Sequence, residues 1–128
     1  MRIGIIGYGK MGKAIEKIAI NRGHSVSFKT NNYNTSLVKD VDIAIEFSTP
    51  ESAFNNIESC LNNNIPVISG TTGWIARLPE IKKTCEQKKG SFLYGSNFSL
   101  GANLFFELNK KLAHLMSDKK QYKVSIDE

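Results

Sequence analysis

Short apolar runs alternate with amphipathic stretches along this chain. Residues 3–6 form an apolar run, and the helical pattern after it ends at Gly23, a residue type that commonly terminates helices. Apolar and polar residues then alternate at 25–29, which predicts a strand with one polar face. The nearly continuous apolar run at 41–47 is typical of a strand buried in a parallel sheet. These patterns predict a strand, a helix and two further strands, in that order.

The rest of the chain continues the alternation. Residues 31–40 are polar and rich in asparagine, which indicates a loop with one helical turn near 36–39. Beyond it the patterns predict helices from Pro50 to about Asn63, from about Ile75 to Lys89 and from about Leu100 to Met116, and strands at 65–69, 91–95 and 122–126. Strand and helix in alternation predict an α/β fold, a Rossmann-like, doubly wound and mostly parallel sheet.

The spacing Gly7-Tyr8-Gly9-Lys10-Met11-Gly12 lies between the first strand and the first helix. This G-x-G-x-x-G pattern predicts a dinucleotide-binding turn in that context. Gly7 allows a tight turn, Gly9 lets the backbone approach a pyrophosphate, and Gly12 lets the helix lie against the sheet. The free N–H groups of the helix N-terminus favour a phosphate. The alternative is an ordinary strand-to-helix turn with glycines used only for packing.

Small and polar residues gather where the predicted strands end, at 7–12, 48–50, 70–73 and 95–99. Ligands of open parallel sheets bind outside the carboxyl ends of the strands, so these clusters predict one cleft. The second strand ends at Lys29 without the Asp or Glu that would bind the ribose 2′-hydroxyl of NAD. Lys29 and the small polar residues at 30–32 could accept a 2′-phosphate, which favours NADPH or use of both nucleotides. The alternative is that Lys29 is an exposed strand residue.

The 128 residues suit one ordinary domain, and 17 Lys and Arg against 12 Asp and Glu make it basic. Lysine doublets such as Lys82-Lys83 and Lys88-Lys89 are interpreted as solvated helix ends, and no nucleic-acid-binding signature accompanies them. We expect no signal peptide, no membrane span and no metal site. Cys60 and Cys85 show no metal or disulfide spacing and predict free thiols in the cytoplasm.

The four clusters resemble one family over essentially the whole chain. The glycine turn, Glu46-Phe47-Ser48-Thr49-Pro50, Gly70-Thr71-Thr72-Gly73-Trp74 and Ser96-Asn97-Phe98-Ser99-Leu100-Gly101-Ala102-Asn103 are similar in order and spacing to 4-hydroxy-tetrahydrodipicolinate reductase, the dihydrodipicolinate reductase of lysine and diaminopimelate synthesis. The resemblance implies that NADPH or NADH contacts Gly7, Tyr8, Gly9, Lys10, Met11, Gly12, Lys29, Phe47, Gly70, Thr71, Thr72, Gly95, Ser96, Asn97 and Phe98. Phe47 would line the nicotinamide side, and Thr72 would also face the substrate carboxylates.

The chain departs from the family pattern in two places. The segment between the second and third strands is shorter, and the His-His pair with a nearby Lys that carries catalysis is absent. We expect that His and Lys beyond Glu128, with 1–121 as the dinucleotide-binding domain and 122–128 as the first strand of a truncated substrate and oligomerisation domain. His24 and His114 are interpreted as structural residues.

The resemblance implies hydride transfer from the nicotinamide to a cyclic imine, a small-molecule substrate, with an acid from the missing domain supplying the proton. The 128 residues alone are expected to be inactive. Full-length members of the family are tetramers, so this portion is expected to be a monomer or a weak dimer. Two alternatives stay open: a semialdehyde or amino-acid dehydrogenase with a similar first domain, and a dinucleotide-binding module without catalysis.

Overall fold

The computed structural model describes residues 1–31, 41–123 and 125, and they fall into two units, Met1–Ser96 and Asn97–Glu128. The described residues of the second unit contain one helix, α4 (Leu100–Met116). The elements of the first unit are β1 (Arg2–Ile6), α1 (Lys10–Asn21), β2 (Ser25–Thr30), β3 (Ile43–Glu46), α2 (Pro50–Asn62), β4 (Val67–Ser69), the 3-10 turn η2 (Ile75–Arg77), α3 (Leu78–Gln87) and β5 (Phe92–Tyr94).

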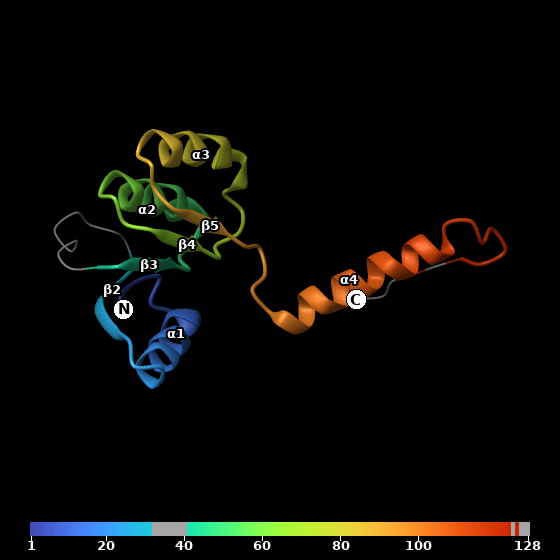
Figure 1. Cartoon of the computed structure of the whole chain (residues 1–128), viewed down its shortest axis with the longest axis horizontal. Helices are drawn as coiled ribbons and strands as arrows, with labels where there is room; N and C mark the ends of the chain where they lie inside the picture. The colour runs from blue at the N-terminus through green and yellow to red at the C-terminus, as the bar shows by residue number, and fades with distance from the viewer. Residues whose placement is uncertain (32–40, 124, 126–128) are drawn as a thin grey trace. The chain divides into compact units, whose positions relative to one another are not determined.

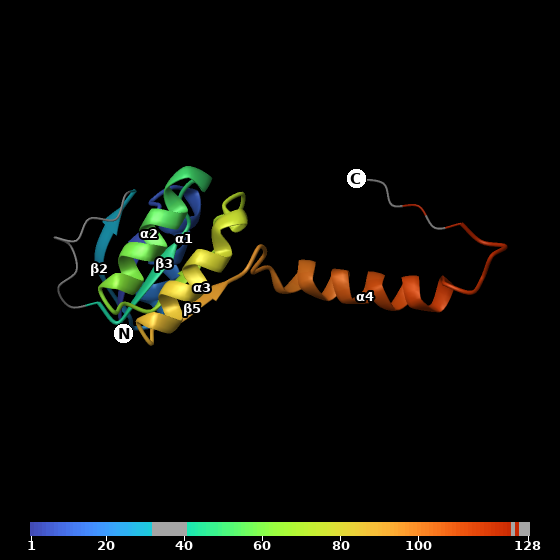
Figure 2. The same ribbon diagram turned by 90° about the horizontal axis from the view of Figure 1, so that it is seen from above.

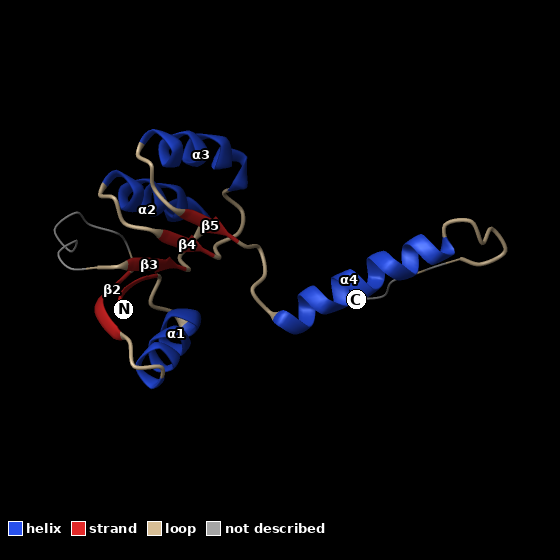
Figure 3. Cartoon of the chain, viewed as in Figure 1, coloured by secondary structure: helices blue, strands red, loops and turns tan. Residues whose placement is uncertain are grey.

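The five strands of the first unit form one parallel sheet in the order β2-β1-β3-β4-β5, drawn as the red layer of Figure 3. The chain leaves β1 toward β2 on one side and later returns to place β3 on the other side. This reversal creates a switch point between β1 and β3, where the two crossover connections diverge and a ligand-binding crevice can open. The parallel, helix-covered sheet confirms the predicted Rossmann-like α/β class.

Helices cover both faces of this sheet, with α1 on one and α2 and α3 side by side on the other (Figures 1 and 2). Under α2 and α3 the core contains residues such as Ile57, Leu61 and Ile81, each with no exposed side-chain surface. A smaller core under α1 holds Ile3 and Ile5 with Ala19. Both cores come from apolar positions that recur at helical or strand spacing, as the sequence pattern predicts.

Several predicted elements differ from the structure at their ends, and the strands expected at 65–69 and 91–95 are observed as the shorter β4 and β5. The helix expected from about Ile75 begins instead as η2, and α3 starts at Leu78 with Pro79 in its first turn, where a missing N–H costs little. The strand expected at 41–47 is observed as β3 over Ile43–Glu46, and Asp42 just before it turns its carboxylate to Arg2. The Arg2 backbone N–H donates to Asp42 Oδ2 (2.7 Å), its guanidinium donates to Oδ1 (2.7 Å), and these bonds lower the pKa of Asp42.

Two further predictions fall on residues that are only partly described. The helical turn expected at 36–39 lies outside the described residues. Of the strand expected at 122–126, residues 122, 123 and 125 are described and are not in a strand, and the others lie outside the described part. The proposed boundary after residue 121 therefore stays a prediction.

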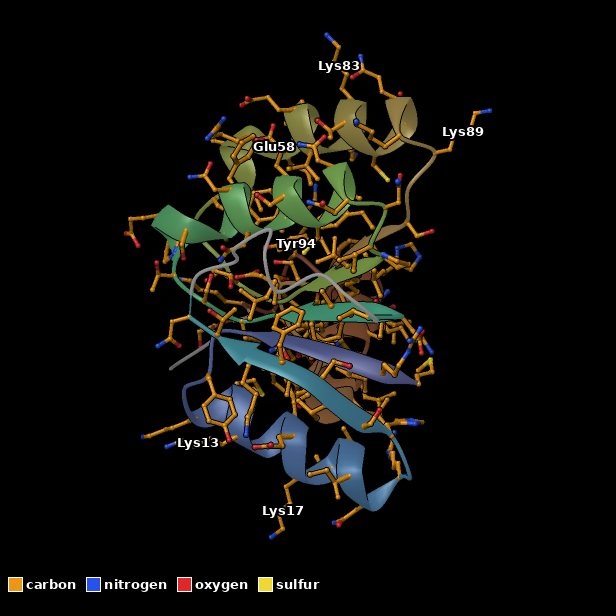
Figure 4. All side chains as sticks on the ribbon, turned by 90° about the vertical axis from the view of Figure 1, so that its left-hand side faces the viewer. Lys13, Lys17, Glu58, Lys83, Lys89 and Tyr94 are labelled. Carbon is orange, nitrogen blue, oxygen red and sulfur yellow. The ribbon has the colours of Figure 1, made fainter. Side chains whose placement is uncertain are left out.

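Several lysines of the first unit lie on the outer sides of its helices. In Figure 4, Lys13 and Lys17 point away from the sheet on α1, and Lys83 and Lys89 point outward at α3 and just beyond its end. This placement agrees with the interpretation of the lysine doublets as solvated helix surface. In the described part of the chain, no helix combines the length and hydropathy needed to cross a membrane.

Candidate functional site

The glycine turn after β1 is pressed against the end of β3. Gly7 has a φ of +91°, and a side chain there would overlap the carbonyl of Phe47. Its N–H donates to Thr30 O (2.7 Å), which ties the same turn to the end of β2. Only glycine meets both demands, a left-handed backbone and a close approach of another backbone. The turn therefore marks the point where the ends of β1, β2 and β3 converge.

Gly9 and the start of α1 form an open N-terminus. Gly9 is the N-cap and is exposed, and a Cβ built on it meets nothing within 4 Å. Among the described residues no side chain caps α1, and its first turn holds no acidic residue. Lys10 and Met11 are exposed beside it. Gly12 is buried and packs so closely on the turn that a side chain there would overlap Gly7 O. Open backbone with uncapped amides is the arrangement that binds phosphate at helix N-termini.

Two hollows open at the carboxyl edge of the sheet, on either side of Phe47 and Ser48, which line both. The first, about 290 Å³, lies beside the glycine turn, and the second, about 320 Å³, extends toward the loop after β4. The first is also lined by Gly7, Gly9, Asn31, Thr49 and Ser52, and the second by Met11, Pro50, Gly70, Thr71 and Thr72. The structure thus brings together predicted site residues from three separate crossover loops.

The Gly70–Trp74 loop is anchored by its last residue. Trp74 is buried, its indole N–H donates to Thr71 O (2.7 Å), and its ring meets Tyr94 edge to face at 5.6 Å. Gly73 takes a φ of +84°, and a side chain on Gly70 would overlap the Phe47 ring. The two glycines thus allow a sharp loop to lie directly on Phe47, while the tryptophan joins that loop to the core.

A buried carboxylate lies beneath this edge. Glu46, at the end of β3, has no exposed surface, and its oxygens accept four hydrogen bonds. Oε1 accepts from Ser48 N–H (2.9 Å), from Ser48 Oγ, and from Thr71 Oγ1 (3.0 Å), and Oε2 accepts from Ser69 Oγ (2.6 Å). The Asn56 amide of α2 donates to Ser48 Oγ (3.1 Å) and extends the network. The network joins the turn after β3 to the loop after β4.

A second polar cluster surrounds Lys29, the residue expected to accept a 2′-phosphate. Its ammonium donates to Glu16 Oε1 (2.9 Å) and lies 5.0 Å from the centre of the Tyr8 ring, and the Tyr8 hydroxyl donates to Glu16 Oε2. The bond with Lys29 lowers the pKa of Glu16 and raises that of Lys29. The bond with Glu16 raises the pKa of Tyr8. A carboxylate is therefore present at the end of β2, although it comes from α1.

The predicted residues at 95–98 divide between the two units. Gly95 donates its N–H to Ser69 O (3.2 Å), so it continues the sheet edge beside the Gly70 loop, and Ser96 is exposed. Asn97 and Phe98 belong to the second unit, where Asn97 Oδ1 accepts from Ser99 N–H (2.8 Å) just before α4. The cofactor roles of these residues stay predictions.

Sequence reasoning missed the contacts of several residues at this edge. Asn31 was expected only as one of the small polar residues near a 2′-phosphate, yet its Oδ1 accepts the Tyr8 N–H (3.0 Å). Glu46 and Ser69 lie within or at the end of apolar runs, and Glu16 lies on α1. One signal was available in the sequence: Glu46 is a carboxylate inside the buried run at 41–47, and the hydroxyl residues Ser48 and Thr49 follow shortly after it.

A parallel sheet with a switch point, an open glycine turn at the first crossover and hollows along the carboxyl edge define a Rossmann-like dinucleotide-binding domain. The chain belongs to the family described as dihydrodipicolinate reductase, N-terminus, whose model matches residues 19–98. It is 46% identical to the 4-hydroxy-tetrahydrodipicolinate reductase of Christiangramia forsetii, over all of this chain, and 34% identical to that of Zymomonas mobilis, over 88% of it. The chain spans 55% and 48% of the lengths of these two relatives.

Solved structures show the same fold at low sequence identity. A putative homoserine dehydrogenase from Archaeoglobus fulgidus matches 73% of this chain and 42% of its own, with a TM-score of 0.61 and 17% identity. A probable dehydrogenase from Thermotoga maritima matches 93% of this chain and 41% of its own, with a TM-score of 0.56 and 14% identity. At these identities the likeness concerns the fold alone.

Proposed function

We propose that this chain is the cofactor-binding part of a 4-hydroxy-tetrahydrodipicolinate reductase and that it binds NADPH and NADH at the carboxyl edge of its sheet. The observation that carries the proposal is the open N-terminus of α1 at the switch point, where Gly9 leaves space above uncapped amides. The residues fit a dinucleotide there, because the pyrophosphate requires bare backbone and unpaired N–H groups. The names of the relatives with 46% and 34% identity support the particular reaction.

Different residues around the hollows would contact different parts of an extended dinucleotide. The amides after Gly9 would bind the pyrophosphate, and Tyr8 and Lys29 would lie on the adenosine side. Phe47, which lines both hollows, would separate that side from the nicotinamide side, where Thr72 and the backbone of Gly70 lie. When bound, the dihydronicotinamide supplies a hydride to the cyclic imine. The chain's own residues would orient it and shield one of its faces from water.

Both nucleotides are proposed as ligands because of the cluster at the end of β2. Lys29 supplies a positive charge for a 2′-phosphate, while Glu16 offers a carboxylate beside it. The ion pair is partly exposed, with 43% of the Lys29 side chain and 20% of the Glu16 side chain accessible, so water and salt weaken it. Lys29 is therefore available to a 2′-phosphate at modest cost, and an unphosphorylated ribose meets no repulsion.

We do not propose any residue of this chain as the proton donor of the reaction. His24 directly precedes β2 and so lies at the amino edge of the parallel sheet, opposite the hollows, and His114 lies on α4 of the second unit. We propose that the His and Lys of the reaction lie beyond Glu128 and that residues 1–128 alone bind a nucleotide without turnover. The substrate contact of Thr72, a tetrameric full-length enzyme and a monomeric or weakly dimeric fragment remain parts of this proposal. So does a cytoplasmic location, supported by the free thiols.

Calorimetric titration of the chain with NADPH and with NADH tests the proposal, with GTP as a control polyanion because the chain has a net charge of +5. We expect saturable binding of both dinucleotides at one site and no saturable binding of GTP. Dihydronicotinamide absorbance should stay constant when the cyclic imine is added. Absence of heat with both dinucleotides, or equal binding of GTP, would refute the assignment.

A further inference from the structure

The Glu46 carboxylate makes no direct contact in the proposed cofactor site, although it lies beneath the edge where that site forms. We propose that Glu46 is a positioning residue: it ties the turn after β3 to the loop after β4 and so determines where Gly70 and Thr72 stand. This inference rests on the proposed dinucleotide binding and adds to it a residue that touches no ligand. Three features of the network support this role: the free-energy cost of burying the Glu46 carboxylate, the positions of its hydrogen-bond donors, and the different settings of Thr71 and Thr72.

Burying a carboxylate is unfavourable unless hydrogen bonds replace its water. Glu46 is fully buried, and in the described part of the chain no lysine, arginine or histidine forms an ion pair with it. The hydrogen bonds that replace its lost hydration come from the backbone N–H of Ser48 and from the hydroxyls of Ser48, Ser69 and Thr71. An apolar side chain would fill the same space without this requirement, so the acid serves an end other than filling the core.

Every donor to Glu46 comes from a strand end or crossover loop at the ligand edge. Ser48 follows β3, Ser69 ends β4, and Thr71 lies in the loop after β4. The links to a helix are indirect: the Asn56 amide and the Ser52 hydroxyl, both on α2, donate to Ser48 Oγ. A carboxylate only accepts hydrogen bonds, so the donors must all turn inward toward one point. The network thus fixes two adjacent loops relative to each other, and these loops line the second hollow.

The same contacts distinguish Thr71 from Thr72, although both border the second hollow. The Thr71 hydroxyl donates to Glu46 Oε1 and accepts the Ser48 N–H (2.8 Å), and the residue is buried. Thr72 is exposed and lines the second hollow. Because Thr71 is held inward, its neighbour faces the space proposed for the nicotinamide. Thr71 thus contributes to the site mainly by holding the loop, and Thr72 is the threonine that a ligand meets.

The test compares Glu46→Gln with the core variant Ile57→Val, which removes a methyl group from α2 without touching the network. Gln keeps the size of Glu46 but replaces one acceptor oxygen with a donor. We expect NADPH affinity, measured by calorimetry on folded protein, to fall at least tenfold in Glu46→Gln and less than twofold in Ile57→Val. Without ligand, the Ser48 amide should lose hydrogen-exchange protection at least tenfold in Glu46→Gln, while the Leu61 amide keeps its own.

A double-mutant cycle with Thr71→Val separates positioning from a general loss of stability. If Glu46 acts through Thr71, the double variant should bind NADPH no more weakly than the weaker single variant. Should Glu46→Gln not fold, Ser69→Ala removes one donor and is expected to weaken NADPH binding about threefold. Parent-like affinity in the folded Glu46 variant, or in Ser69→Ala in its place, overturns the inference. If the parent binds neither nucleotide, the proposed function fails, and unchanged Ser48 exchange in the variant would then also refute the role of Glu46.

Discussion

Replacing Gly9 with alanine should separate the binding role of the glycine turn from its role in the fold. Gly9 has a φ of −86°, outside the left-handed region that favours glycine, and its new methyl group would meet nothing within 4 Å. Loss of chain freedom in the unfolded state stabilises such a variant by about 0.4–1 kcal/mol, whereas alanine is a poorer N-cap than glycine by a similar amount. The two effects nearly cancel, so we expect the free energy of unfolding to change by less than about 1 kcal/mol.

The same methyl group would stand where phosphate oxygens must approach the amides of α1. We expect NADPH to bind Gly9→Ala at least tenfold more weakly than the parent, a loss of about 1.4 kcal/mol. Gly12→Ala is the matched control, since its methyl would overlap Gly7 O and lie 3.2 Å from Ile5 Cγ2. A backbone carbonyl cannot move aside as a flexible side chain can, so this variant should lose about 1–3 kcal/mol of stability or more.

Urea denaturation gives the stabilities, and calorimetric titration gives the affinities of the two variants and the parent. Unchanged stability with weakened binding in Gly9→Ala would confirm that the turn contacts the ligand. The reasoning is refuted if Gly9→Ala binds NADPH as tightly as the parent, because open backbone at the α1 N-terminus would then have no part in recognition.

Three further results are expected. Glu16→Gln should raise NADPH affinity relative to NADH, measured by parallel titrations, because Lys29 loses its carboxylate partner; an unchanged ratio would contradict this. Burial raises the pKa of Cys60 to about 12, so iodoacetamide should label the half-buried Cys85 first, and faster labelling of Cys60 by mass spectrometry would argue against its burial. Asp42→Asn should lower stability at about pH 7, and the loss should shrink as the pH falls below the ordinary value of 3.8 and through the lowered pKa of Asp42, because the carboxyl stabilises the fold only while it is ionised; a loss that urea titrations find independent of pH would exclude an ionic cause.

The sequence pattern predicted the elements well, because each has a local cause. The helix expected from Leu100 to Met116 has those bounds, and Ser99 caps it by accepting the Ala102 N–H (3.3 Å). Strand ends were less predictable, since they depend on partners far away in the sequence. Asp42 is an example: its pairing with Arg2, forty positions away, is invisible to a local pattern.

The site was predictable as far as it depends on backbone, and less so where it depends on side-chain partners. Glycine spacing located the turn because few other residues tolerate its geometry. The partners of Lys29 were missed, since nothing in the spacing shows that Glu16 on α1 reaches the end of β2. Glu46 was missed for a related reason. A pattern of polar and apolar positions shows only that one acid interrupts a strand, and it does not show the hydrogen-bond donors at 69 and 71 that are distant in the sequence.

The anchoring of the Gly70–Trp74 loop by Trp74 has a consequence for how this protein can be altered. The indole ring packs edge to face against Phe92 and Tyr94 on β5, and its N–H donates a hydrogen bond to the carbonyl oxygen of Thr71 in the loop. Substitutions at those two aromatic positions are therefore expected to weaken nucleotide binding in a random-mutagenesis screen, even though neither side chain lines either hollow. Because the chain has one tryptophan, its fluorescence emission reports directly on the contact between this loop and the core.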